Sequence, residues 1–407
     1  MVSLVCPEVW PNDCIRIEQP TRIAIISDLD KFGWAGCEEL WAALARKALK
    51  DGHEVAFLQS RQTVAPEKIA PLRQMGLELV PQSAGGRLID QVKNRVSWKV
   101  GGFASLFVRS FGQLHRFSPD VIFFTAGGAL PPPAFLDDLE RSGALKYPYV
   151  VVCHNSHIFE KPVTKAEREK AARYYLGARR VLFVAERTRR ETEHLLATHL
   201  TGTAIIRNPV NMADSSPIPM PSGSTVRIAS MGRLTINSKG QDVLLAALGS
   251  AEWKGRDWLA SIYGSGPHLD LLRALAAHYG IAERVLFKGH VGDVRTVWAE
   301  NHLLALPSRN ESAPLVVVEA MLCGRPCVAN DVGGIREWIS EPETGFISEG
   351  INIESFQSAL GRAWSARADW EAMGRRARDK ALQMFDPDPG GTLLDILREV
   401  VTSAAGG

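Results

Sequence analysis

The chain has 407 residues, with 47 Lys and Arg against 45 Asp and Glu, which leaves a formal net charge of +2 at pH 7. At about 150 residues per domain this length predicts two or three domains, and the near-zero charge argues against a general nucleic-acid binder, which carries a strong basic excess. Hydrophobic residues make up 45% and charged residues 23% of the chain, which excludes a disordered, highly charged polypeptide.

The cysteines and the apolar runs indicate a cytoplasmic protein. Six cysteines are too few for a disulfide scaffold, and Cys323 and Cys327 form a C-x3-C pair without a second pair or a nearby His, so no zinc site is expected. Residues 1–14 lack the basic and apolar regions of a signal peptide. The longest weakly charged run, 121–136, is shorter than the ~20 residues that span a membrane.

Short apolar runs alternate with amphipathic segments in the first half of the chain. Residues 22–30 are typical of a buried parallel strand, a glycine loop follows up to Gly36, and apolar residues at helical spacing predict a helix over 37–49. Further strands are predicted at 54–59, 121–126, 149–154 and 180–185. The alternation predicts a doubly wound α/β domain over residues 1–206.

The Pro-rich stretch 207–224 is predicted to be a linker, after which the same alternation resumes. Strands are predicted at 226–234, 258–266, 284–291, 302–308 and 325–331, a helix at 375–385, a break at 386–391 and a last helix at 392–404. We therefore expect a second domain over 225–389 and a C-terminal helix, within 390–407, that returns to the first domain. Ligands of such sheets bind at the carboxyl ends of the strands.

Two glutamates in the segment 307–339 are the first chemical signal. On one helix, Glu311 and Glu319 would be rotated by about 80° and lie ~12 Å apart, which suits neither a metal pair nor a shared proton. We instead expect Glu311 in the loop after strand 302–308, and a helix that begins near Leu315 and carries Glu319. The free N–H groups and positive dipole at that helix start suit a phosphate.

Cations and glycines in the loops of the second domain give a second signal. Arg233 and Lys239 follow the strand 226–234 and precede a predicted helix, an arrangement that suits a diphosphate clamp. Gly264 and Gly266 match only part of a dinucleotide-binding fingerprint, because Leu269 stands where the third glycine belongs.

The order of motifs resembles the retaining glycosyltransferases of family four, the group 1 glycosyltransferases, which have the GT-B fold of two Rossmann-like domains facing a cleft. The motifs are GRL…SKGQD, YGSGPHLDLLRALA, VLFKGHV, PSR-x-E-x7-E-AM-x-CGRP, DVGGIRE and TGF, with looser matches at EELW, DGHEV, VCHNSH and RNPVN. The resemblance covers about residues 22–385.

The resemblance implies a role for each matching residue. Arg233 and Lys239 neutralise the donor diphosphate, Glu311 contacts the transferred sugar, and Glu319 binds the nucleotide ribose. The remaining donor-binding positions are Gly36 near the phosphates and acceptor, Gly264 in its loop, Gly289, His290 and Val291 beside the base, and Pro314, Leu315 and Val316 around the sugar hydroxyls and phosphate. His154, near the sugar, is implied to be catalytic together with Glu311, Arg233 and Lys239. Pro314 itself has no N–H to offer.

The resemblance also implies the reaction. A nucleotide-diphosphate sugar, with UDP the most frequent nucleotide, gives its sugar to a hydroxyl of a saccharide or lipid-linked acceptor in cell-surface polysaccharide or glycolipid assembly. Configuration is retained by front-face attack, with the leaving phosphate helping to take the acceptor proton. Two cations and a helix N-terminus stabilise the diphosphate electrostatically, so no metal and no other cofactor is expected.

Three positions depart from the family pattern. The double glycine of the first loop appears as Ala35-Gly36, the residues after Glu311 are Ser-Ala-Pro where Gly-Phe-Gly is common, and Ala185 stands where a Ser is usual after the strand 180–184. The first two positions touch sugar and phosphate in the family, so they bear on the identity of the sugar.

Plainer interpretations of the same residues remain open. Glu311 and Glu319 taken alone fit surface carboxylates, Lys239 fits a helix-start residue, and His154 fits a hydrogen-bonded core histidine. The D-x-D pairs Asp28/Asp30 and Asp386/Asp388 are rejected as metal sites, because the first ends a strand in the wrong domain and the second sits in a Pro-rich helix break.

The segment 87–116 holds six Lys and Arg, one acid and several aromatic residues. It fits either peripheral contact with the cytoplasmic membrane face or a helix with a solvated basic face. Two alternative functions also stay open: a sugar-nucleotide epimerase or hydrolase of the same fold, and a non-catalytic nucleotide-sugar-binding subunit.

Overall fold

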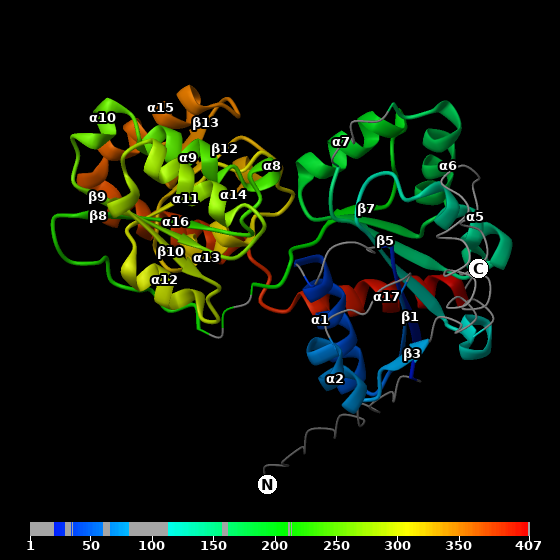
Figure 1. The fold of residues 1–407 in the computed structure, drawn as a ribbon. Helices are drawn as coiled ribbons and strands as arrows, with labels where there is room; N and C mark the ends of the chain where they lie inside the picture. The colour runs from blue at the N-terminus through cyan, green and yellow to red at the C-terminus, as the bar shows by residue number, and fades with distance from the viewer. Residues whose placement is uncertain are drawn as a thin grey trace, which may run out of the picture.

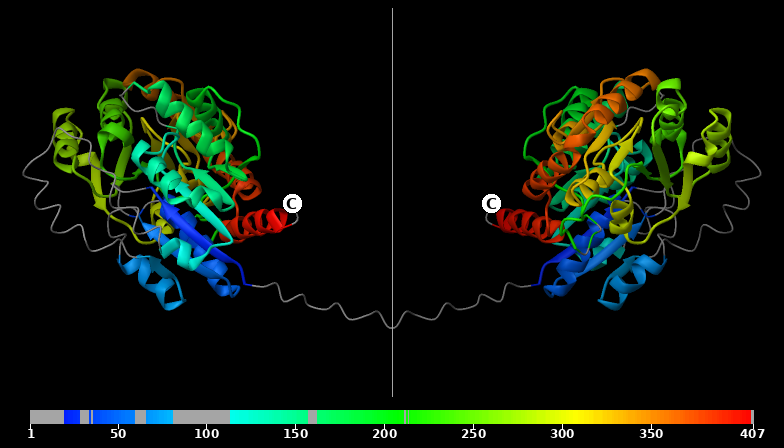
Figure 2. Two further views of the ribbon diagram at one scale, coloured as in Figure 1. Left: turned by 90° about the vertical axis from the view of Figure 1, so that its right-hand side faces the viewer. Right: turned by 90° about the vertical axis from the view of Figure 1, so that its left-hand side faces the viewer.

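The computed structural model describes residues 20–28, 34, 36–59, 66–80, 113–156, 162–210, 212 and 214–405. Within these residues the chain forms two α/β domains that lie side by side and are joined by the stretch between β7 and β8 (Figure 1). Figure 2 shows the pair from two sides. Residues 87–112 of the basic segment 87–116 lie outside the described residues. Asp30 and Ala35 also lie outside them.

The N-terminal domain is built on a parallel sheet whose described strands have the order β3-β2-β1-β4-β5-β6-β7. They are β1 (Arg22–Ser27), β2 (Glu54–Gln59), β3 (Glu78–Val80), β4 (Val121–Ala126), β5 (Tyr149–Cys153), β6 (Arg180–Phe183) and β7 (Thr203–Ile205). β4 and β5 are buried at every position, as expected for parallel strands covered on both faces.

The helices of this domain cover both faces of the sheet. Those with described bounds are α1 (Gly36–Lys50), α2 (Pro66–Gln74), α5 (Pro133–Ser142), α6 (Lys165–Leu176) and α7 (Glu186–Leu196), with a 3-10 turn at Ala144–Lys146. One apolar cluster lies on each face, and α1 contributes Leu40, Trp41 and Leu44 to one of them.

The C-terminal domain is built on a second parallel sheet whose described strands have the order β10-β9-β8-β11-β12-β13. They are β8 (Val226–Met231), β9 (Trp258–Tyr263), β10 (Val285–Gly289), β11 (Leu303–Leu306), β12 (Cys327–Asn330) and β13 (Gly345–Ser348). The strand order reverses between β8 and β11, and the loops after these two strands are therefore the expected place for a ligand.

The helices of this domain again pack on both faces. They are α8 (Ile236–Lys239), α9 (Gln241–Leu248), α10 (Ala251–Lys254), α11 (Leu269–His278), α12 (Val294–Glu300), α13 (Leu315–Leu322), α14 (Ile335–Trp338), α15 (Ile353–Ser365) and α16 (Trp370–Met384), with 3-10 turns at Ala282–Arg284 and Arg367–Asp369. Apolar clusters again lie on both faces of the sheet.

The last helix, α17 (Pro389–Ala405), leaves the C-terminal domain and packs against α1 of the N-terminal domain (Figure 1). Leu393, Leu394 and Leu397 are fully buried in the core that α1 also lines. These leucines recur at the i, i+1, i+4 spacing of one helical face, so burial of that face fixes where α17 docks.

The predicted doubly wound fold with two domains is confirmed, while several element bounds differ from those predicted. Two strands match their predicted bounds, and the other observed strands are shorter than predicted by up to three residues, because the remaining residues belong to the flanking loops. The strands β3, β7 and β13, of three or four residues each, are not predicted from the sequence. The helix predicted at 392 begins at Pro389, because Pro suits the first helical position and Asp388 accepts a hydrogen bond from the Gly391 N–H at 3.0 Å.

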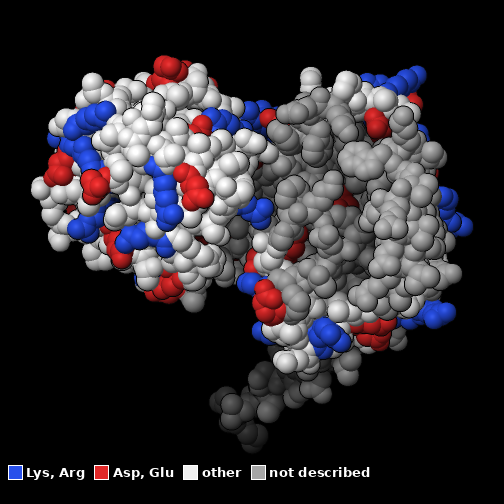
Figure 3. Space-filling view, in the orientation of Figure 1, with Lys and Arg blue, Asp and Glu red and all other residues white. Residues whose placement is uncertain are grey.

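No helix in the described part of the chain is long and apolar enough to cross a membrane. On the face shown in Figure 3, Lys and Arg side chains are interspersed with Asp and Glu over the C-terminal domain. On this face of the C-terminal domain, charges of both signs are therefore mixed rather than gathered into one patch.

Candidate functional site

The loop after β8 carries the two cations predicted from the sequence. Arg233 is exposed, and its guanidinium makes no ion pair with any residue that the structure describes. Lys239 ends α8, and its Nζ lies 2.7 Å from Oε1 of Glu311. The structure therefore brings Lys239 and Glu311 together from loops that are 72 residues apart in the chain.

Glu311 lies in the loop after β11, as predicted, and its side chain is only 9% exposed. Ser308, which is fully buried, donates its hydroxyl to the same oxygen, Oε1, at 2.8 Å. Hydrogen bonds to an ionised carboxylate are stronger than neutral ones, so the two donors fix the direction of this side chain.

The Glu311 loop is held in place by neighbouring side chains that the sequence argument did not single out. Arg309 forms a bidentate pair with Asp242, at 2.7 and 2.8 Å, and also donates to the carbonyl of Ile236 at 2.6 Å. Asn330, which is fully buried, donates to the carbonyls of Pro307 and Ser308. Arg309 lies inside the PSR motif and Asp242 inside the SKGQD motif. Their place in these motifs is the sequence signal that could have identified them.

Helix α13 begins at Leu315, as predicted, with Pro314 at the preceding cap position. The N–H groups of Leu315 and Val316 make no hydrogen bond within the described part of the chain. Free N–H groups at a helix start, together with the helix dipole, form a ready anion-binding site. This helix start lies in the same loop region as the Lys239–Glu311 pair.

Glu319 lies one turn into α13 and is 7% exposed. Among the described residues it has no ion-pair or hydrogen-bond partner for its carboxylate, and burial alone raises its pKa to about 7. An acid held without a counter-charge is costly to ionise in a protein interior. The carboxylate is therefore available to a ligand hydroxyl, which is the role that the family resemblance implies.

The predicted glycines of this domain divide into two kinds. Gly264 has a φ of +121°, and a Cβ there would overlap the carbonyl oxygen of Gly232. A glycine at 264 is thus required because the loops after β8 and β9 touch. Gly289, whose carbonyl accepts from the Gly264 N–H at 2.6 Å, has open space where a Cβ would stand, and His290 beside it is exposed while Val291 is half-buried.

The N-terminal domain contributes Gly36 and His154. A Cβ on Gly36, the first residue of α1, would come 3.2 Å from Cδ1 of Leu315, so the starts of α1 and α13 face each other across the domain boundary. His154 follows β5, is 7% exposed and lies 3.1 Å, Nε2 to Oγ1, from Thr125. Burial lowers the pKa of His154 to about 3, so the imidazole is neutral near pH 7.

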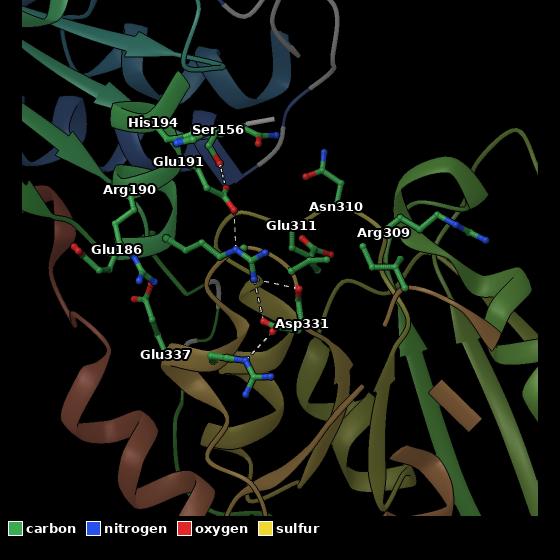
Figure 4. Close-up of a pocket in the computed structure, with 16 residues that line it drawn as sticks. Ser156, Glu186, Arg190, Glu191, His194, Arg309, Asn310, Glu311, Asp331 and Glu337 are labelled. Carbon is green, nitrogen blue, oxygen red and sulfur yellow. Dashed lines mark hydrogen bonds and ion pairs between the residues drawn. The ribbon is translucent and has the colours of Figure 1, made fainter. Parts of the chain in front are cut away.

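A cavity of about 1000 Å³ lies between the two domains. Figure 4 shows residues of α7 and the segment after β5 on one side and the loops after β11 and β12 on the other. Glu311 is the one residue named from the sequence among the described residues that line it; the others include Asn155, Arg190, His194 and Asn310. Asn155 and Ser156 come directly after His154, which places this predicted segment at the cavity wall.

Charged side chains of the two domains form ion pairs along the wall of this cavity. Arg187 of α7 bonds Glu191 at 2.7 Å and Asp331 of the C-terminal domain at 2.9 Å, and Arg336 bonds the other oxygen of Asp331 at 2.7 Å. Ser156 donates its hydroxyl to Glu191.

The described residues include no group of three or more His, Cys, Asp or Glu side chains that could hold a metal ion. Asp28 accepts a hydrogen bond from the Gly127 N–H at 2.7 Å. Asp386 accepts from the Asp388 N–H at 2.8 Å and from the Thr392 hydroxyl at 2.7 Å. The second D-x-D pair therefore lies in the break between α16 and α17, as predicted, and its carboxylates accept hydrogen bonds at the start of α17.

Arg325 of the CGRP motif has a structural role that the sequence did not reveal. It is 1% exposed and donates to the carbonyls of Trp298 and Asn301 at 2.8 Å and to those of Ile218 and Pro219 at 2.9 and 2.7 Å. Because residues 218 and 219 belong to the predicted linker, this arginine ties the linker to the C-terminal domain. Cys323 and Cys327 beside it are buried free thiols.

The fold and this site define a GT-B protein, in which two doubly wound domains face a cleft at the carboxyl ends of their strands. Residues 34–214 match the family described as Glycosyltransferase Family 4, and residues 225–366 match Glycosyl transferases group 1. The chain therefore belongs to the family-four, group 1 glycosyltransferases, as the sequence motifs predict.

Several curated proteins are similar to part of the chain. The GDP-mannose-dependent alpha-(1-6)-phosphatidylinositol monomannoside mannosyltransferase of Mycolicibacterium smegmatis is 31% identical over 35% of this chain and 40% of its own length. The N-acetyl-alpha-D-glucosaminyl L-malate synthase of Bacillus anthracis is 35% identical over 30% of this chain and 32% of its own length. The matched stretch thus spans less than half of each relative.

A solved structure extends the likeness of fold over nearly the whole chain. The crystal structure of Anabaena HepE in complex with UDP covers 94% of this chain and 100% of its own, with a TM-score of 0.69 and 17% identity. The two-domain arrangement is therefore shared at low sequence identity.

Proposed function

We propose that this chain is a retaining, metal-independent glycosyltransferase that moves a sugar from a nucleotide-diphosphate sugar to a hydroxyl of a saccharide or lipid-linked acceptor. The observation that carries the proposal is the Lys239–Glu311 pair, 2.7 Å long, beside the free N–H groups at the start of α13. Cations, a carboxylate and a helix start meet there at the strand ends of a GT-B domain.

Departure of the nucleotide is the step that these residues assist. Arg233 and Lys239 supply positive charge for the diphosphate, and the N–H groups of Leu315 and Val316 supply fixed donors. Preorganised charge of this kind is usually the largest single contribution to catalysis. Lys239 also bonds Glu311, so its ammonium group contacts both the diphosphate and the carboxylate that faces the sugar. The charge that develops on the leaving diphosphate is therefore coupled to the position of Glu311.

Retention by front-face attack fits the surroundings of Glu311. Retaining hydrolases that use double displacement place two carboxylates ~5 Å apart, whereas Glu311 is bonded to Lys239 and Ser308. We assign Glu311 to stabilising the transferred sugar, and the leaving phosphate to accepting the acceptor proton. We assign the neutral imidazole of His154 to a hydrogen bond with the sugar.

We also propose which nucleotide the donor sugar carries. One relative is named as GDP-mannose-dependent and one structural neighbour was solved with UDP; we propose UDP as the nucleotide, from its frequency in the family. A panel of UDP-, GDP-, ADP- and TDP-sugars in a thermal-shift assay tests this, since ligand at ~100 times its Kd adds ~2.7 kcal/mol of stability.

The acceptor that we propose is a saccharide or a lipid-linked saccharide at the cytoplasmic side of the membrane. The four described cysteines are free thiols, which supports a reducing compartment. Contact of the segment 87–116 with the membrane stays a prediction, and flotation with liposomes that contain or lack anionic lipid tests it.

Glu311→Gln and Lys239→Ala test the proposed activity in a donor-consumption assay. We expect both to lower turnover at least 100-fold, because each removes charge at the reacting groups, while the exposed controls Glu283→Gln and Lys254→Ala retain wild-type rates. Near-wild-type turnover in both site variants would refute the assignment.

The same assay separates the alternatives. Consumption of donor without acceptor, with release of an altered sugar, indicates an epimerase or hydrolase, and failure to bind any nucleotide sugar indicates a non-catalytic subunit. Activity that a chelator abolishes and Mn²⁺ restores would contradict metal independence.

A further inference from the structure

The helix α7 of the N-terminal domain has an unusual cap. Its N-cap residue is Ala185, which offers no side-chain acceptor to the first turn. The N–H groups at a helix start need partners from outside the helix, and Ser, Thr, Asp or Asn usually supplies one. Here the N–H of Glu186 donates to Oε1 of Glu337 at 2.7 Å, so the cap comes from α14 of the other domain.

The second oxygen of Glu337 binds the linker. Oε2 accepts from Nη1 of Arg207 at 2.9 Å, and the guanidinium of Arg207 lies 5.2 Å from the ring centroid of Trp338. Glu337 and Arg207 are 20% and 22% exposed. One carboxylate thus joins a helix of the N-terminal domain, the linker and α14, and both of its partners carry positive charge or a positive dipole end.

The turn before α14 contacts both α7 and the Glu311 loop. Gly333 has a φ of +52°, and a Cβ there would overlap the carbonyl oxygen of Glu311. The N–H of Gly334 donates to the carbonyl of Ser312 at 2.8 Å, and a Cβ on Gly334 would come 2.9 Å from Cβ of Ala185. The small residue at 185 therefore allows α7 to lie against the turn that supports Glu311.

An ion pair extends the same contact along the cavity wall. Arg187, one residue into α7 from Glu186, bonds both Oδ1 and the carbonyl of Asp331, at 2.9 and 3.1 Å. Asp331 begins the segment that contains Gly333, Gly334 and Glu337. The contact is thus continuous along the wall of the cavity that holds Glu311, and Glu337 lines the same cavity next to the linker.

We propose that Glu337 is a positioning residue that sets the N-terminal domain, which lines the cavity with α7 and the segment after β5, relative to the Glu311 loop. The proposal rests on the proposed glycosyl transfer, because transfer requires reacting groups from both domains at near-contact distance. A misplacement of about 1 Å can cost ~100-fold in rate. Glu337 acts through α7 and the Gly333–Gly334 turn and does not touch the reacting atoms.

Two variants and one control separate the parts of this role. Glu337→Ala removes the cap of α7 and the partner of Arg207, whereas Glu337→Gln keeps an oxygen for the Glu186 N–H and loses the charge. The matched control is Glu283→Ala, which removes an exposed carboxylate of the same domain that forms no ion pair with any described residue. Glu337→Gln also serves as the test protein if Glu337→Ala does not fold.

Three measurements are made on each variant: donor turnover, UDP and GDP affinity by calorimetry, and the radius of gyration by small-angle X-ray scattering. For Glu337→Ala we expect turnover to fall at least tenfold, with Glu337→Gln between it and wild type. Nucleotide affinity should stay within about twofold, because the assigned nucleotide contacts lie almost wholly in the C-terminal domain. The radius of gyration should increase as the interdomain contact loosens.

The outcomes also separate this proposal from the proposed function. A Glu337→Ala protein with wild-type turnover and an unchanged scattering curve would overturn it, as would a parallel loss of turnover and nucleotide affinity, which marks a general structural defect. If wild type consumes no donor, the proposed function fails, and scattering then decides alone: an unchanged radius of gyration in both variants overturns the positioning role.

Discussion

Glu319 offers the sharpest test of the site, because its burial makes a prediction about stability that is separate from activity. The carboxylate is 7% exposed, and burial raises its pKa from 4.5 to about 7. We predict that Glu319→Gln makes the protein more stable at pH 8 than wild type, with the gap shrinking as the pH falls.

The magnitude follows from the pKa difference between the folded and unfolded chain. A rise from 4.5 to about 7, at 1.36 kcal/mol per pH unit, corresponds to ~3 kcal/mol of unfavourable ionisation in the folded state. For an acid whose folded pKa is raised, the stability that protonation provides is fully present below about pH 4.5 and is lost as the pH rises to about 7. Glutamine cannot ionise, so the variant avoids this loss.

Urea unfolding at pH 5, 6, 7 and 8 measures the gap, with Glu283→Gln as the exposed control. Most of the ~3 kcal/mol should develop between pH 5 and pH 8. The change in the gap with pH, rather than its value at one pH, isolates ionisation from the packing of an amide in place of a carboxyl. A gap that stays constant over this range would refute the reasoning, since it would mean that the folded protein does not resist ionisation of Glu319.

The same substitution should weaken nucleotide binding. Loss of a hydrogen bond to a charged group costs ~1.5–3 kcal/mol, so UDP affinity by calorimetry is expected to fall roughly tenfold or more. A variant that gains stability and loses affinity shows the trade-off expected of a residue kept for function. Unchanged UDP affinity would remove Glu319 from the proposed donor site.

Further predictions concern residues whose roles the structure defines. Arg325→Ala should lower the melting temperature markedly, because buried linker carbonyls lose their donors at ~1–3 kcal/mol each, and Arg325→Lys should not restore it, since an ammonium lacks the planar fork; a lysine variant that melts like wild type would contradict this. Leu397→Ala, in the core between α17 and α1, should cost ~2–5 kcal/mol by calorimetry, whereas the exposed control Leu382→Ala should cost little. Because burial lowers the pKa of His154 to about 3, wild type should lose stability as the pH falls below 6.5, where the unfolded chain takes up a proton first; His154→Gln should remove that part of the loss, and identical pH–stability curves would contradict a buried neutral imidazole.

The sequence alone predicted the two-domain α/β fold and the loop and helix positions of the candidate site residues. Runs such as 121–124 and 149–153 consist of apolar and aromatic residues, which is typical of strands covered on both faces. The loop position of Glu311 and the helix start at Leu315 also followed from the sequence, because the change from strand to helix periodicity lies between them. The strands β3 and β7 escaped prediction because three residues carry too little periodicity.

The contacts between the candidate site residues were decided by the tertiary structure. Lys239 and Glu311 are 72 residues apart, and Glu186 and Glu337 are 151 apart; nothing local in either segment names its partner. Arg325 looked like part of a catalytic-family motif, and only its burial among linker carbonyls shows a structural role. Composition and periodicity are read over short stretches of the chain, so they determine the helices and strands and their order. Pairing, burial and pKa depend on which distant loops the strand order brings to one edge of the sheet, and these are properties of the packed molecule.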